Sequence, residues 1–129
     1  MGIFWTVYPL NEQMKEYLDS EDVSYPDVPS RFPKDEELHE ALSELKGYKI
    51  TKSQGGDGWG AFIESEDGSG KVWANLQVEI LEDDNSLRSI WFEKGHEELI
   101  IEFLKNLSKS CGPQALIADA GGLPEVIGA

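Results

Sequence analysis

The chain has 129 residues, enough for one domain with its own hydrophobic core, and 40% of them are hydrophobic, which excludes a disordered composition. It carries 25 acidic against 11 basic residues, and the net charge of −14 disfavours binding to nucleic acid or to anionic membranes. Such a charge favours a basic protein partner, although acidity of this kind in bacterial cytosolic proteins also serves solubility alone. No apolar run approaches the ~20 residues that span a bilayer, and the single cysteine excludes an internal disulfide, so we expect a cytoplasmic protein.

The first 20 residues predict a strand followed by a short helix. Residues 2–10 are rich in β-branched and aromatic side chains, which favour a strand, and Pro9 ends the run. Asn11 is a good N-cap, because its side chain can accept a hydrogen bond from the first turn of a helix. The apolar residues that follow have the i, i+3, i+4 spacing of one helix face: Met14, Tyr17 and Leu18.

An irregular stretch separates this helix from a second one. Residues 20–33 contain three prolines, which remove backbone donors, so we expect a segment without regular structure on the surface of the single domain. A strict apolar stripe then predicts a helix that Gly47 ends. His39 lies off this stripe, which favours a solvated side chain. The stripe consists of Leu38, Ala41, Leu42 and Leu45.

The middle of the chain predicts a meander of antiparallel strands. Residues 71–81 alternate apolar and polar side chains with period two, which is typical of a strand with one face on the core. Shorter strands are expected at 48–52, 59–64 and 87–92, separated by turns rich in glycine, aspartate and asparagine. The side of the 71–81 strand away from the core carries Trp73, Asn75, Gln77 and Glu79.

The last third predicts an amphipathic helix from His96 to a stop at Gly112, then a short apolar strand at 115–119 and a tail that packs back on the sheet. The complete order predicts an α+β fold: a mostly antiparallel sheet of five to six strands with two or three helices packed on one face. The pairing of the first and last strands is left open between an edge and the centre of the sheet.

No catalytic or metal-binding motif is present, so we expect no cofactor, no metal and no enzyme of a recognised type. Cys111 and His96 lie at opposite ends of one predicted helix, ~22 Å apart, which excludes a nucleophile pair and favours Cys111 as a packed apolar side chain. Two histidines and one cysteine have no zinc-site spacing. The turn that contains Asp83 and Asp84 could hold a divalent cation weakly, but a solvated turn is favoured.

Two sets of residues remain as candidates for binding. Trp59, Trp73 and Trp91 lie on neighbouring predicted strands and could share one sheet face, where acids such as Asp83 and Asp84 would surround them. The alternative is that helices cover this face and the tryptophans belong to the core.

Asp119 ends an apolar strand before two glycines and could line a pocket, whereas the simpler interpretation is that it caps a turn. The favoured hypothesis is a small acidic binding protein, for instance an immunity- or antitoxin-like inhibitor of a basic protein partner. The alternative is a small-ligand-binding domain or an unrecognised enzyme with a pocket near Asp119 and the Gly55–Gly60 loop.

Overall fold

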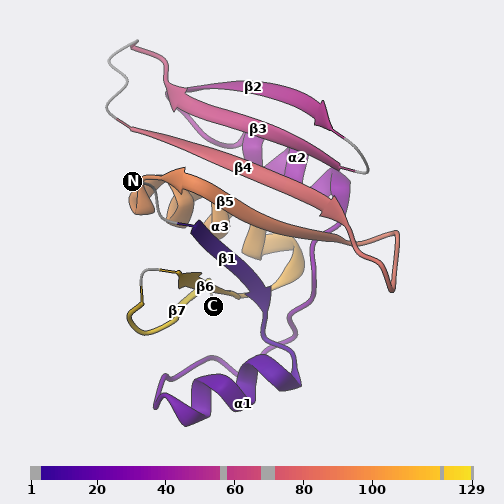
Figure 1. Cartoon of the computed structure of the whole chain (residues 1–129), viewed down its shortest axis with the longest axis vertical. Coiled ribbons are helices and arrows are strands. Elements are labelled where there is room, and N and C mark those ends of the chain that lie inside the picture. The colour runs from indigo at the N-terminus through magenta and orange to yellow at the C-terminus, as the bar shows by residue number, and fades with distance from the viewer. Residues whose placement is uncertain (1–3, 56–57, 68–71, 120, 129) are drawn as a thin grey trace.

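Seven antiparallel strands form one sheet in the order β2-β3-β4-β5-β1-β6-β7 (Figure 1). The computed structural model describes residues 4–55, 58–67, 72–119 and 121–128, so parts of the predicted turns at 54–60 and 66–70 lie outside the described residues. The elements are β1 (Phe4–Pro9), α1 (Glu12–Ser20), α2 (Asp35–Ser43), β2 (Tyr48–Gly55), β3 (Gly58–Ser65), β4 (Trp73–Ile80), β5 (Arg88–Gly95), α3 (Glu97–Cys111), β6 (Gln114–Ala118) and β7 (Glu125–Ile127).

The predicted α+β class is confirmed, but the sheet has seven strands rather than five to six. The additional strand is β7, which arises because the tail pairs with β6 over three residues instead of only lying against the sheet. The first strand is central: β1 pairs with β5 on one side and with β6 on the other.

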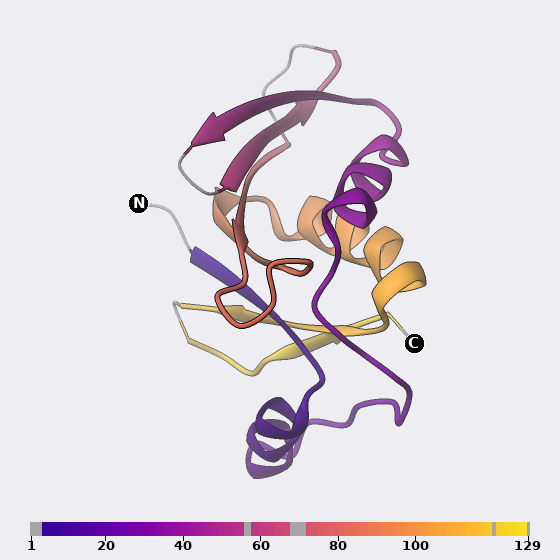
Figure 2. The same cartoon turned by 90° about the vertical axis from the view of Figure 1, so that its right-hand side faces the viewer.

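Helices α2 and α3 pack together on one face of the sheet (Figures 1 and 2). The predicted stripe of α2 is buried, and the ring of Phe103 on α3 meets Phe92 of β5 edge to face, with 5.9 Å between the ring centroids. No helix in the described ranges is long and apolar enough to cross a membrane. The fully buried side chains of α3 are Leu99, Ile100, Phe103, Leu104 and Leu107.

The third helix, α1, lies apart from the other two. Asn11 caps it as expected, its side-chain oxygen accepting a hydrogen bond of 2.9 Å from the backbone nitrogen of Met14. Met14 and Leu18 form a second small core with Ala115 of β6, whose side chain points away from the main core. Helix α1 therefore covers only the β6–β7 end of the opposite sheet face (Figure 2).

The proline-containing segment between α1 and α2 crosses the molecule as an irregular strap, which we define as residues 21–34. The backbone nitrogen of Arg31 donates to the carbonyl of Cys111 at the end of α3, and that of Arg88 donates to the carbonyl of Pro33. The strap passes close to Gly112, whose φ is +87°. A Cβ atom on Gly112 would collide with the carbonyl of Pro29 and with Ser30.

This close approach predicts that Gly112→Ala is severely destabilising. The cost combines a positive φ with a backbone collision, and we expect roughly 3 kcal/mol or more in urea unfolding. Gly47→Ala is the matched control, because Gly47 has nearly the same φ of +82° but no described atom within 4 Å of an added Cβ. It should cost only about 1 kcal/mol from the backbone conformation. Equal costs for the two variants would show that the strap does not press on Gly112.

Candidate functional site

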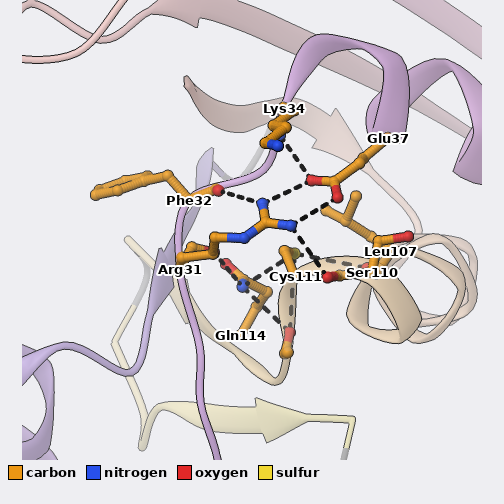
Figure 3. Close-up of polar contacts among 9 residues, drawn as sticks. Arg31, Phe32, Lys34, Glu37, Leu107, Ser110, Cys111 and Gln114 are labelled. Atoms are coloured by element: carbon orange, nitrogen blue, oxygen red, sulfur yellow. Dashed lines mark hydrogen bonds and ion pairs between the residues drawn. The ribbon is translucent and has the colours of Figure 1, made fainter. Parts of the chain in front are cut away.

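One polar network fastens the strap to both core helices (Figure 3). The guanidinium of Arg31 donates two parallel hydrogen bonds of 2.7 Å to the Glu37 carboxylate and a third, of 3.2 Å, to the carbonyl of Ser110 on α3. Glu37 also accepts from the backbone nitrogen of Lys34 at 2.8 Å. These bonds from Arg31 and Lys34 outweigh burial and hold the pKa of Glu37 below its ordinary value of 4.5.

Below this ion pair, Gln114 and Cys111 complete the network (Figure 3). Gln114 is 1% exposed, and its amide nitrogen donates to the carbonyls of Arg31 and Gly112 at 3.1 and 3.2 Å and lies 3.4 Å from the Cys111 sulfur. Burial raises the pKa of the Cys111 thiol to about 12, so the thiol is protonated at neutral pH. The cluster is suited to hold three segments together and not to nucleophilic chemistry.

A second polar cluster lies where α2 meets β3 and β5. The Oδ1 atom of Asp35 accepts hydrogen bonds from the indole nitrogen of Trp59 at 2.7 Å and from Arg88 at 3.2 Å. Burial alone would raise the pKa of Asp35, but the hydrogen bond from Trp59 and the charge of Arg88 outweigh it and lower that pKa below 3.8.

His39 belongs to this cluster, although its side chain remains 39% exposed, as the sequence predicted for a residue off the apolar stripe. Its ring stacks on Trp59 with centroids 4.4 Å apart and planes 8° apart. The Lys52 ammonium lies 2.8 Å from Nδ1 and can only donate, so Nδ1 accepts and the proton sits on Nε2, which faces Asp35 at 3.3 Å. Both ring nitrogens and both Asp35 oxygens are therefore committed to contacts within the fold, which favours a structural role.

The three candidate tryptophans do not share one face of the sheet. Trp59 pairs with Val78 and points with Ala61 toward α2, whereas Trp73 and Trp91 point to the opposite side. The alternation of side chains along each strand predicts this difference. Trp59 is separated by an even number of residues from the apolar side chains of its strand and shares their face, whereas Trp73 alternates with those of its own strand and lies on the other face.

The face opposite α2 and α3, over strands β2, β3, β4, β5 and β1, is here called the open face. Among the described residues no helix packs on it, and in Figure 1 it lies toward the viewer, with α2 and α3 behind. Its side chains are Lys49, Thr51, Ser53, Phe62, Glu64, Trp73, Asn75, Gln77, Glu79, Ser89, Trp91, Glu93, Phe4, Thr6 and Tyr8, together with the bare backbone of Gly60.

Aromatic side chains are spread across the open face. Phe4, Tyr8 and Phe62 are 48%, 39% and 37% exposed, and Trp73 and Trp91 are half-buried. Phe62 and Trp73 touch across β3 and β4 with ring centroids 5.8 Å apart. Trp73 is thus neither in the core nor beneath a helix.

Carboxylates lie beside these rings. By register, Glu64 is directly opposite Trp73, Glu93 is opposite Phe4, and Glu79 is opposite Ser89. Lys49, opposite Glu64 on β2, is the one base among the paired positions of this face. The open face therefore combines exposed aromatic surface with an excess of negative charge.

The candidate aspartates lie away from the tryptophans and have local structural contacts. Asp84 accepts hydrogen bonds from the backbone and hydroxyl of Ser86, which lower its pKa and shape the β4–β5 turn beside exposed Asp83. Asp119 accepts at 3.0 Å from the backbone nitrogen of Phe4 and extends the β1–β6 ladder. Within the described residues no three metal-ligating side chains come together.

The order of the strands places Asp119, after β6, far from the glycines of β3, so the two do not line one pocket. Four strand steps separate β6 from β3, which is about 19 Å. A hollow of about 150 Å³ does lie on the open face beside Gly60, between Ser53, Gln77 and Trp91. Sequence reasoning missed it, although its signal, a glycine within a strand, is present at Gly60.

No protein-family model, curated protein or solved structure matches this chain. The functional assignment therefore depends on the geometry and charge of the surfaces described above.

The burial of Cys111 predicts an unreactive thiol. We expect native protein to release almost no colour with Ellman's reagent at neutral pH, because the thiol is both covered and protonated. Unfolded protein should titrate one thiol per chain. The variant Ser110→Cys, which places a thiol at the exposed neighbouring position, should titrate one thiol when native and two when unfolded. A fast native reaction of the unaltered chain would contradict the closed network.

The Arg31–Glu37 ion pair predicts a specific pH dependence of stability. Because the pKa of Glu37 is depressed in the folded state, its contribution is complete above the ordinary value of 4.5 and is lost as the pH falls through the lower folded value. The stability difference between the native chain and Glu37→Gln should therefore shrink on acidification, measured by urea unfolding from about pH 7 to 3. Glu36→Gln removes an exposed carboxylate from the same turn and controls for the loss of one charge. A difference that does not change with pH would overturn this role.

Proposed function

We propose that this chain is an acidic binding protein and that its open face docks a basic protein partner. The observation that carries the proposal is the set of exposed aromatic side chains on the sheet face that α2 and α3 leave uncovered. An immunity- or antitoxin-like inhibitor, which covers the functional surface of a basic protein, is the form of this function that the net charge favours.

The aromatic residues of the open face are not needed to complete the core. The main core lies on the other side of these strands, between the sheet and helices α2 and α3, and does not include the open-face side chains. Exposed rings such as Phe4 and Phe62 leave apolar surface in water, which is unfavourable unless a partner covers it. Aromatic side chains with a polar rim are also the usual source of binding energy at protein interfaces.

The charge of the chain supports a basic partner over a nucleic acid. A net charge of −14 repels phosphate and attracts a positive protein from a distance, which accelerates encounter. On the open face Glu64, Glu79 and Glu93 place this charge beside the aromatic rings, where it would meet lysine and arginine side chains of the partner.

Photo-crosslinking at matched tyrosines tests the proposal directly. Tyr8 on the open face and Tyr17 on α1 are 39% and 40% exposed, so a benzophenone amino acid at each position samples equally accessible sites on two different surfaces. In cells that produce the protein, we expect the probe at Tyr8 to crosslink to a basic protein and the probe at Tyr17 not to do so. Mass spectrometry of the crosslinked peptides identifies the partner.

Binding of the purified partner should then distinguish the two tyrosines. Tyr8→Ser should weaken affinity by about tenfold or more, as for an aromatic interface residue, while Tyr17→Ser leaves it unchanged. The association rate should fall steeply with salt. Crosslinks to a second copy of this chain, to an acidic protein, or equally from both positions would refute the proposal.

A further inference from the structure

The hollow on the open face arises from one missing side chain. Cross-strand pairing aligns Ser53, Gly60, Gln77, Trp91 and Thr6 in a single row across five strands, and every member except Gly60 carries a side chain. The resulting space of about 150 Å³ has the backbone of β3 as its floor and Trp91 as part of its wall.

The backbone does not require glycine at position 60. Its φ is not in the positive region, but an added Cβ would lie 3.2 Å from the carbonyl oxygen of Leu76 and 3.4 Å from Ser53 Oγ and Gln77 Oε1, so these neighbours would have to shift by a few tenths of an ångström. At Gly58, by contrast, a Cβ would collide with the carbonyl of Val78. The main physical effect of glycine at position 60 is therefore the open space above it.

Two of the polar side chains that line this space, those of Gln77 and Glu79, offer hydrogen-bond acceptors to it. The Gln77 amide nitrogen donates to Asn75 at 3.2 Å, which turns the Gln77 oxygen toward Gly60. The Glu79 carboxylate also lines the hollow, and among the described residues it has no ion-pair partner. Within the described part of the chain, no lysine or arginine lines the space. An occupant should consequently be a donor of several hydrogen bonds and positively charged.

The guanidinium of arginine matches these walls. It is planar and can stack on the indole of Trp91 while its N–H groups reach Glu79 and the oxygen of Gln77. A space of ~150 Å³ is enough for a group the size of benzene, which is larger than a guanidinium. We propose that the Gly60 hollow binds a single arginine side chain of the basic partner, an inference that rests on the docking function proposed above.

A second copy of this chain is poorly suited to supply that arginine. The sequence contains two arginines, Arg31 and Arg88. Arg31 is held by Glu37 in the strap network, and Arg88 is held by Asp35 at 3.2 Å. Insertion of either into a neighbouring molecule would break an ion pair within its own fold, so a partner with exposed arginines is favoured.

A short peptide tests the hollow without the partner. The four tryptophans give four indole N–H signals in a ¹H–¹⁵N NMR spectrum, and these are titrated with acetyl-Gly-Arg-Gly-amide. We expect a saturable shift of the Trp91 signal in the millimolar range, with Trp5 unaffected because it points into the core away from the hollow. The same peptide with citrulline, which has the shape of arginine without the charge, should produce no saturable shift.

Variants of the hollow make the test specific. Gly60→Leu should abolish the shift of Trp91 by filling the space, and Glu79→Gln should weaken binding about two- to fivefold by removing one partly exposed charge. Glu64→Gln, which removes a carboxylate on the same face outside the hollow, should have no effect. If Gly60→Leu perturbs folding, the test is the comparison of peptide affinity between Glu79→Gln and Glu64→Gln.

The outcomes separate this inference from the docking function. Equal shifts with arginine and citrulline, equal effects of Glu79→Gln and Glu64→Gln, or no saturable shift of Trp91 would overturn the arginine site, even where Tyr8 crosslinks to a basic protein. A specific arginine shift without such crosslinks would support the hollow and refute the docking function.

Discussion

The insertion of β1 between β5 and β6 decides which surface of this protein is left open. Because β1 is antiparallel to both neighbours, β5 and β6 run parallel to each other and need a crossover connection, which α3 provides. Helix α3 therefore crosses one face of the sheet, and α2 packs beside it on the same face. The short helix α1 covers only the β6–β7 end of the other face. The exposed aromatic residues are a consequence of this topology.

The positions of the lysine and arginine side chains add to the difference between the two faces of the sheet. Arg31 binds Glu37, Arg88 binds Asp35, and Lys52 binds His39, so several of the few positive side chains are used within the fold at the start of α2. Of these contacts, the Arg31–Glu37 pair is bidentate and the Arg88–Asp35 pair is partly buried, geometries in which ion pairs stabilise more than isolated surface pairs do. On the open face, three carboxylates face one lysine. The interactions that hold the structure together thus leave the described carboxylates of the open face without arginine partners.

Much of the architecture could be predicted because it depends on local periodicity. The alternation from Val72 to Ile80 located β4 and its two faces, and the apolar stripe after His96 located α3. What could not be predicted depends on distant partners. Nothing near Asp35 in the sequence indicates that Trp59 and Arg88 will share its carboxylate, and the strap gives no local sign that Arg31 will reach Glu37 and Ser110. The prediction that Trp59 and Trp73 share one sheet face failed for a different reason. It relied only on their lying in neighbouring strands, whereas the alternation of side chains along each strand places the two residues on opposite faces.

Charge and shape on the open face should control different parts of binding. Long-range attraction between a chain of charge −14 and a basic protein acts before contact, so it raises the association rate and is screened by salt. Contacts of Phe62 and Tyr8 would form only after the surfaces meet, so they would lengthen the lifetime of the proposed complex and depend little on salt. A surface with only carboxylates would bind any cation briefly. The aromatic rings and the hollow add the shape requirement that would make binding selective for one basic protein among many.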